Sequence, residues 1–120
     1  MRVREDYALG KIDLLAPGLI LYEVGNALRF HPNGTEETSL KSVTSLRKMQ
    51  LMLEAVHDRV VEAAMRISYA EGVSFYDSVY LALAEAENCK VISADEQLVK
   101  RLKKYQGLAL LLGDYSLKFS

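Results

Sequence analysis

Residues 74–98 read SFYDSVYLALAEAENCKVISADEQL, and this stretch decides the architecture of the chain. Apolar residues recur every three or four positions from Phe75 to Ala86, which predicts a helix with one apolar face. Ser74 suits the N-cap of this helix, and together with the acid three positions later it resembles a capping box with a shortened acid. Asn88 is the expected stop. The stretch therefore begins with a helix that has defined ends.

The second half of the stretch is expected to bring two acidic residues together. Residues 90–94 predict a short buried strand, and another helix begins near Asp95. A helix of about 13 residues is roughly 20 Å long, and a strand of about five residues covers roughly 16 Å. A strand that runs back along the helix therefore ends level with the start of that helix. Asp77 and Asp95 are then expected to be neighbours, in the crevice where α/β sheets place their ligands.

Composition limits the classes of protein that the chain can belong to. The chain has 120 residues, of which 50% are hydrophobic, so one domain spanning 1–120 can bury a core. A net charge of −1 predicts no general affinity for polyanions. Cys89 is the only cysteine, which excludes an internal disulfide and a cysteine zinc cluster and suits a reducing cytosol. No stretch approaches the roughly 20 apolar residues of a membrane span, so we expect a cytoplasmic protein without a membrane segment.

Helices alternate with short apolar strands along the rest of the chain. Further helices are predicted over residues 3–11, 18–30, 36–49, 57–71 and 95–105. Further strands are predicted over residues 12–16, which Pro17 ends, and 108–112, whereas residues 50–56 fit either a continued helix or a short edge strand. Such alternation predicts a parallel α/β sandwich.

The same periodicity predicts which residues are buried. The helix over residues 18–30 has few polar side chains and is expected to be buried around most of its circumference. The apolar face of the helix over residues 57–71, which Gly72 should cap, is expected to consist of Val60, Ala64, Ile67 and Ala70. Several further large side chains are expected in the core, namely Tyr22, Met49, Met52, Tyr76 and Tyr80.

Three acidic residues each have a structural and a functional interpretation. Glu23 lies among apolar helical neighbours, so it either emerges at the helix edge or is buried with a partner, which a metal ion would supply. Asp77 either completes the cap of its helix, where its charge suits the positive end, or faces the crevice. Asp95 either caps the next helix, a role that Ser93 with Glu96 could also fill, or faces the same crevice.

Three segments together resemble the PIN-domain family of metal-dependent nucleases. They are APGLILYEVGNAL at residues 16–28, SFYDSVYLALA at 74–84 and VISADEQL at 91–98, and they occur in the family's order. The resemblance is closest to the small single-domain ribonuclease toxins of bacterial and archaeal toxin–antitoxin pairs, the VapC type. It implies a PIN-like three-layer α/β/α sandwich with a short parallel sheet.

The resemblance also implies a role for each matching residue. The catalytic and metal-binding residues would be Glu23, Asp77 and Asp95, with Asn26, Ser93 and Glu96 in the supporting shell. The implied cofactor is Mg²⁺ or Mn²⁺, which hard oxygen ligands suit, and which relieves the repulsion between clustered carboxylates. The implied function is a metal-dependent endoribonuclease that hydrolyses RNA phosphodiesters and has an antitoxin protein as partner.

One feature of the family has no counterpart in this sequence. The family begins with a hydrophobic strand that forms the middle of the sheet and ends in a metal-binding aspartate. Residues 3–16 match the family's second helix and second strand instead, and neither Asp6 nor Asp13 falls at the position of that aspartate. The chain thus resembles an N-terminally truncated PIN domain that lacks about 20 to 30 residues. The alternative function is a PIN-like binding or interaction domain that cuts RNA weakly or not at all.

Two further expectations concern RNA contact and assembly. Four basic residues of the last helix either contact RNA phosphates or form a solvated face, namely Lys100, Arg101, Lys103 and Lys104. Without a first strand, the strands at 12–16 and 90–94 each lack a neighbour, and unpaired buried backbone groups cost about 1–3 kcal/mol each. These strands should pair with each other or with a second copy of the chain, and we favour a homodimer.

Overall fold

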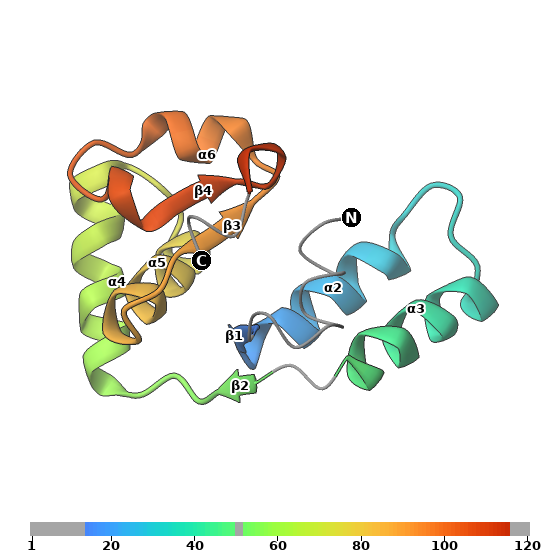
Figure 1. Cartoon of the computed structure of the whole chain (residues 1–120). Helices are drawn as coiled ribbons and strands as arrows, with labels where there is room; N and C mark the ends of the chain where they lie inside the picture. The colour runs from blue at the N-terminus through green and yellow to red at the C-terminus, as the bar shows by residue number, and fades with distance from the viewer. Residues whose placement is uncertain (1–13, 50–51, 116–120) are drawn as a thin grey trace. The chain divides into compact units, whose positions relative to one another are not determined.

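The computed structural model describes residues 14–49 and 52–115, which form two compact units (Figure 1). The first unit lies within residues 13–55 and is called the α2–α3 unit. The described residues of the second unit begin at Val56, and this unit is called the α4–α5 unit. The helix predicted over residues 3–11 and the first residues of the strand predicted at 12–16 lie outside the described residues.

The α2–α3 unit is a helical hairpin with a pair of short strands. Its elements are β1 Leu15–Pro17, α2 Leu19–Arg29, α3 Glu36–Lys48 and β2 Met52–Glu54. The two strands pair in parallel, with Leu15 opposite Met52, and the Gly18 N–H extends the pairing by donating to the Glu54 carbonyl at 3.2 Å. The ambiguous residues 50–56 therefore include a strand. Pro17 is the last residue of β1, so the predicted strand extends one residue further than its sequence suggested.

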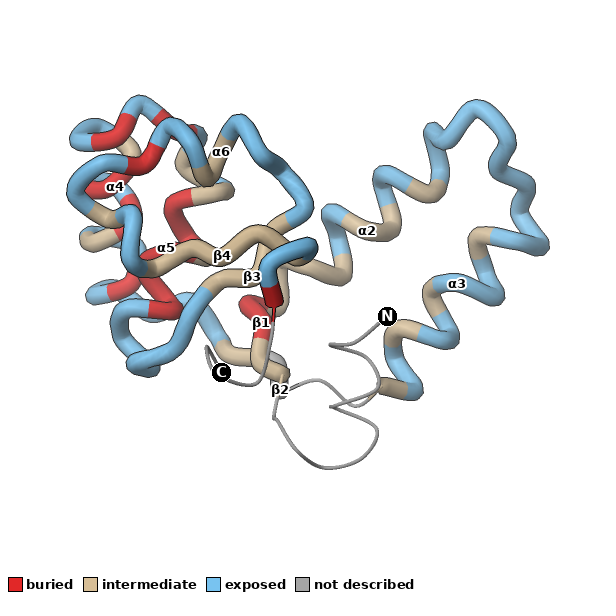
Figure 2. The backbone as a smooth tube through the Cα atoms, turned by 45° about the horizontal axis from the view of Figure 1, so that its top comes forward, coloured by how far each residue is buried: buried red, intermediate tan, exposed pale blue. Residues whose placement is uncertain are grey.

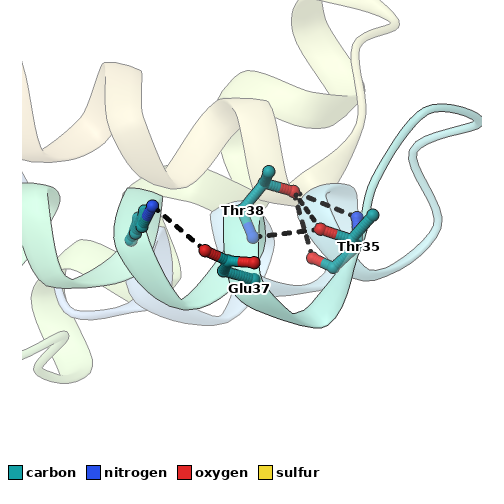
Figure 3. A network of polar contacts seen from close by, with 4 residues as sticks. Thr35, Glu37 and Thr38 are labelled. Carbon is teal, nitrogen blue, oxygen red and sulfur yellow. Dashed lines mark hydrogen bonds and ion pairs between the residues drawn. The ribbon is translucent and has the colours of Figure 1, made fainter.

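A capping box starts α3 (Figure 3). The Thr35 hydroxyl accepts from the Thr38 N–H at 3.1 Å, and the Thr38 hydroxyl accepts from the Thr35 N–H at 3.0 Å. One turn further on, Lys41 and Glu37 form an exposed ion pair at 3.2 Å. The two Thr35–Thr38 hydrogen bonds satisfy N–H groups that a helix start otherwise leaves unpaired, which defines the α3 boundary.

Within its described residues, the α4–α5 unit contains a second parallel strand pair and three α-helices. Its elements are α4 Asp58–Glu71, α5 Phe75–Ala86, β3 Val91–Ser93, α6 Glu96–Arg101 and β4 Ala109–Leu111, with 3₁₀ turns at Gln106–Leu108 and Leu112–Asp114. Val91 lies opposite Ala109 in the parallel pairing of β3 with β4. The last helix ends at Arg101, so the prediction that it runs to about residue 105 was wrong.

The core of this unit lies between α4 and α5, where the buried residues of the two helices gather (Figure 2). The α4 side contributes Val60, Ala64 and Ile67, which are at most 1% exposed. The α5 side contributes Val79, Leu81, Ala82, Leu83 and Ala84. Complete burial of branched aliphatic side chains is worth about 1.5–3 kcal/mol each, so this contact dominates the stability of the unit.

The helix ends around this core agree with the sequence signals. Gly72 follows α4 with φ 68°, in the left-handed region, and its N–H donates to the Ser68 carbonyl at 2.9 Å. Ser74 caps α5 by accepting from the Asp77 N–H at 3.0 Å. Asn88, which was expected to stop α5, has φ 54°. The predicted boundaries of α4 and α5 are therefore confirmed.

Several burial predictions were wrong. No residue of α2 is buried, and Tyr22 is 76% exposed, because a single helix, α3, packs against α2 within its unit. Tyr76 is 59% exposed, while Tyr80 and Met49 are half-buried. On α4, Ala70 is exposed and the next residue, Glu71, is buried instead. An apolar period predicts a face but not which neighbouring element covers it.

Replacing Gly72 tests whether its left-handed backbone matters. An added Cβ at Gly72 would meet no atom within 4 Å, so the cost of Gly72→Ala comes from the positive φ alone. We expect the free energy of unfolding to fall by about 1–2 kcal/mol in chemical denaturation. Gly72→Asn should lose less, because asparagine tolerates this conformation. Gly113→Ala is the matched control, since Gly113 also has open space but no positive φ. Equal losses at the two glycines would contradict the explanation.

Candidate active site

Asp77 lies in the first turn of α5 and is half-buried. Its backbone N–H donates to the Ser74 hydroxyl, but among the described residues its carboxylate takes part in no hydrogen bond or ion pair. The cap of α5 is thus made by Ser74 without the acid. The interpretation of Asp77 as the second half of a capping box therefore has no support in the geometry. Its carboxylate keeps all of its acceptor positions for a ligand.

Asp95 is the N-cap of α6. One carboxylate oxygen, Oδ1, accepts from the N–H groups of Gln97 at 3.0 Å and Leu98 at 3.1 Å. The Ser93 hydroxyl accepts from the Asp95 N–H at 3.0 Å and so fixes the backbone on the other side. Of the two capping alternatives, Asp95 itself is the cap. The second oxygen, Oδ2, accepts no hydrogen bond from the part of the chain that the structure describes.

Asp77 and Asp95 belong to elements that contact each other. Asp77 starts α5, Asp95 directly follows the segment that holds β3, and α5 packs against β3. The approach of the two carboxylates to within the reach of one ion stays a prediction. Glu96, the further acid of the predicted site, is exposed in the first turn of α6.

Glu23 and Asn26 lie one turn apart on α2, in the other unit, and both are exposed. Of the two interpretations of Glu23, an acid at the helix edge agrees with this exposure. The meeting of Glu23 with the two aspartates stays a prediction. Within neither unit do three or more described His, Cys, Asp or Glu side chains gather closely enough to hold one metal ion.

The four basic residues lie at the end of α6 and just beyond it. Lys100 and Arg101 form the last turn of the helix, and Lys103 and Lys104 follow it. All four are exposed, and the Arg101 guanidinium donates to the Gly72 carbonyl at 3.0 Å. The basic residues thus form a surface segment that is attached to the end of α4. We call residues 100–104 the basic segment.

Glu71 is the polar residue that the sequence interpretation missed. It ends α4, is only 9% exposed and accepts hydrogen bonds from the backbone N–H groups of Lys103, Lys104 and Tyr105. A signal was present, because residue 71 continues the period of buried positions that runs through Ala64 and Ile67. An acid at such a position indicates a buried carboxylate with dedicated donors.

Two other features of the described chain, a groove and a cysteine, do not involve the candidate acids Glu23, Asp77 and Asp95. A groove of about 580 Å³ between α2 and α3 is lined by Gly25, Leu28, Arg29, Gly34, Thr35, Glu36, Ser39, Leu40 and Val43. Cys89 follows α5, and partial burial together with the Glu87 carboxylate raises the pKa of its thiol. A thiol with a raised pKa stays protonated at neutral pH and is a poor nucleophile. Neither feature offers an alternative catalytic centre.

Comparison with known proteins identifies the family to which the chain belongs. Residues 2–105 match the PIN domain family, so the chain belongs to the PIN-domain family. The arrangement of helices and short parallel strands agrees with the predicted PIN-like α/β fold.

A named relative and a solved structure that resemble the chain both come from Pyrobaculum aerophilum. The chain is 25% identical to Exonuclease VapC9 over 85 residues, which make up 71% of this chain and 64% of that protein. It therefore spans less than two thirds of that relative's length. The crystal structure of PAE2754 superposes with a TM-score of 0.63 at 24% identity, covering 83% of this chain and 71% of the other. In the described ranges, no helix has the length and apolar character that crossing a membrane requires.

Two substitutions separate the capping role of Asp95 from its charge. Asp95→Ala removes the acceptor for two helix N–H groups and should lower the free energy of unfolding by about 1 kcal/mol. Asp95→Asn keeps an oxygen at the capping position and should change stability by only a few tenths of that amount, as measured by urea denaturation. If both variants were as stable as the parent chain, the cap would contribute nothing measurable.

Proposed function

We propose that this PIN domain is a metal-dependent ribonuclease that hydrolyses RNA phosphodiesters. The observation that carries the proposal is the state of two carboxylates in the α4–α5 unit. Asp77 makes no side-chain hydrogen bond among the described residues, and Asp95 uses one oxygen for its cap while the other accepts none. Both acids lie at helix starts and within the range that matches the PIN domain family, and the resemblance described above implies a ligand role for each.

The donor chemistry of the proposed site fits a hard divalent cation. Glu23, Asp77 and Asp95 offer carboxylate oxygens, which Mg²⁺ and Mn²⁺ prefer. When bound, such an ion supplies an activated water and stabilises charge that develops on the phosphodiester. The supporting shell consists of Asn26, Ser93 and Glu96.

The chain's own residues hold the two aspartates in place. The Ser74 hydroxyl fixes the first turn of α5 through the Asp77 N–H at 3.0 Å. The Ser93 hydroxyl fixes the backbone of Asp95, while two α6 amides fix the orientation of its carboxylate. Because these bonds are local, the ligands are ordered before an ion binds, which lowers the cost of binding.

A second candidate function is a PIN-like binding or interaction domain with little or no cleavage. The observation that favours it is the division of the three acids, because Asp77 and Asp95 belong to one unit and Glu23 belongs to the other. Among the described residues, neither unit alone therefore contains all three acids. The RNA substrate, an antitoxin partner and a cytoplasmic location are part of the proposal for either candidate.

Cleavage assays should show weak, metal-dependent RNase activity. We expect weak activity because only three acids match the family's ligand positions. Incubation with Mn²⁺ should degrade RNA, and a chelator should stop the reaction. Since the relative VapC9 is named an exonuclease, the substrates should include a circular RNA, which only an endonuclease opens. Cleavage that survives the chelator, or a circle that stays closed while linear RNA shortens, would contradict the proposed reaction.

Substitution of the acids should abolish this activity. Asp77→Asn, Asp95→Asn and Glu23→Gln each remove a charge at nearly constant shape, and we expect losses on the order of 100-fold or more, because an ion's charge stabilisation is worth several kcal/mol. Asp58→Asn is the matched control, since Asp58 also starts a helix of the α4–α5 unit but matches no ligand position. Activity that is equally reduced in the control would point to a general effect of charge. Full activity in all three site variants would favour the binding domain.

We also propose that the chain forms a homodimer. Each described sheet has only two strands, β1 with β2 and β3 with β4, so the intramolecular pairing of β1 with β3 that was considered from sequence is absent among the described strands. Large side chains such as Tyr69, at 86% exposed, also remain available for contact. Light scattering at micromolar concentration should give twice the 13.5 kDa of one chain. A single 13.5 kDa species with cooperative unfolding would rule out the dimer.

A further inference from the structure

Glu71 holds the backbone that follows α6. Its Oε2 atom accepts from the N–H groups of Lys103 and of Tyr105, the latter at 3.4 Å, and its Oε1 atom accepts from the Lys104 N–H at 3.3 Å. Three successive backbone N–H groups thus converge on one carboxylate, in the manner of the backbone nests that bind anions. With 9% exposure, the carboxylate is largely shielded from water, so these bonds have little competition.

Two further contacts fix the same stretch of chain. The Arg101 guanidinium donates to the Gly72 carbonyl at 3.0 Å, one residue after Glu71. Leu102, between Arg101 and the nest, is 3% exposed and anchors the turn in the core. Backbone on both sides of Leu102 is therefore attached to the end of α4.

These contacts leave the positive charges facing solvent. Lys100, Lys103 and Lys104 are exposed, and none of them forms an ion pair within the described part of the chain. Lys104 lies 5.6 Å from the centre of the Tyr105 ring, which orients its ammonium group. Since Lys100 follows Asp95 by five helical residues, the basic segment begins roughly 7.5 Å from Asp95 along the axis of α6.

We propose that Glu71 is a positioning residue for RNA binding: its buried carboxylate fixes the backbone of residues 103–105 so that the basic segment contacts RNA phosphates beside Asp95. The proposal rests on the proposed function in taking RNA as the ligand, but it does not require cleavage. This role explains why a negatively charged side chain contacts the backbone of a segment that binds phosphates. The nest neutralises the carboxylate through backbone donors and leaves the lysine side chains for the ligand.

The direction in which one substitution changes the affinity for RNA distinguishes a positioning role of Glu71 from a simple effect of its charge. Glu71→Gln removes a negative charge, so charge alone predicts tighter binding of a polyanion. The substitution also replaces one acceptor oxygen by an NH₂ donor that faces backbone donors, which breaks the nest. Positioning therefore predicts weaker binding. Glu62→Gln is the matched control, because it removes the same charge from an exposed position on the same helix.

The test measures the binding of a fluorescent 20-nucleotide oligouridine to the full chain by anisotropy, with chelator present to prevent cleavage. For Glu71→Gln we expect roughly five- to tenfold weaker binding at 50 mM NaCl and a salt slope that is shallower by about 0.7–1, as for the loss of one phosphate contact. Glu62→Gln should bind equally or slightly more tightly. Unchanged or tighter binding by Glu71→Gln would overturn the proposal, as would a parent chain that does not bind the oligonucleotide.

A double-mutant cycle checks that Glu71 acts through the lysines. The Lys103→Ala/Lys104→Ala variant should bind weakly, and adding Glu71→Gln to it should have no further effect; an additional loss of the same size would overturn the proposal. Hydrogen exchange of the parent chain gives a test that needs no variant to fold. The amides of residues 103–105 should exchange slowly, and exchange at the rate of an exposed loop would overturn the proposal. Binding that depends on Glu71 in a chain that cleaves no RNA would separate this inference from the proposed nuclease.

Discussion

The contact between α4 and α5 is the interaction on which the rest of the larger unit depends. Fully buried side chains such as Ile67 and Leu81 meet there, and the short connection through Gly72 leaves little freedom in how the two helices meet. The end of α4 then serves as an anchor for the chain after α6, through Glu71 and through the carbonyl of Gly72. Asp77, in the first turn of α5, follows shortly after this anchor in the sequence. One apolar contact therefore orders both the candidate ligand and the basic segment.

Local signals made most of this unit predictable from sequence. Ser74, Gly72 and Asn88 act through their own backbone geometry and short-range hydrogen bonds, so their effect does not depend on distant parts of the chain. The errors came where a second element decides the outcome. The exposure of Tyr22 depends on which elements cover α2. The length of α6 depends on Glu71, because the backbone N–H groups of residues 103–105 donate to its carboxylate. Such long-range partners leave only a weak trace in the periodicity.

The candidate site shows the same division between local and distant information. Asp77 and Asp95 were found because acids at helix starts are conspicuous in sequence, but a capping acid and a metal ligand are the same residue type in the same place. The structure shows which atoms make the caps, since Asp95 uses one oxygen for its cap and Ser74 caps α5 without the Asp77 carboxylate. The metal-ligand role stays a prediction. Glu23 was identified from its apolar neighbours and from the family resemblance. Its approach to the aspartates stays a prediction, because no local pattern encodes a contact between residues so distant in the sequence.

The parallel pairing of the strands has a consequence for the growing chain on the ribosome. The register pairs Leu15 with Met52 and Val91 with Ala109. The sequence separation between β1 and β2 is therefore about twice that between β3 and β4. Loop-closure entropy differs by only about 0.6 kcal/mol between the two, so equilibrium hardly distinguishes them. The delay during synthesis does distinguish them. At a synthesis rate of about 5–20 residues per second, β1 emerges roughly two to seven seconds before β2. During that interval β1 lacks the pairing that β2 later provides, which is when a chaperone or a neighbouring nascent chain has the best opportunity to occupy its edge.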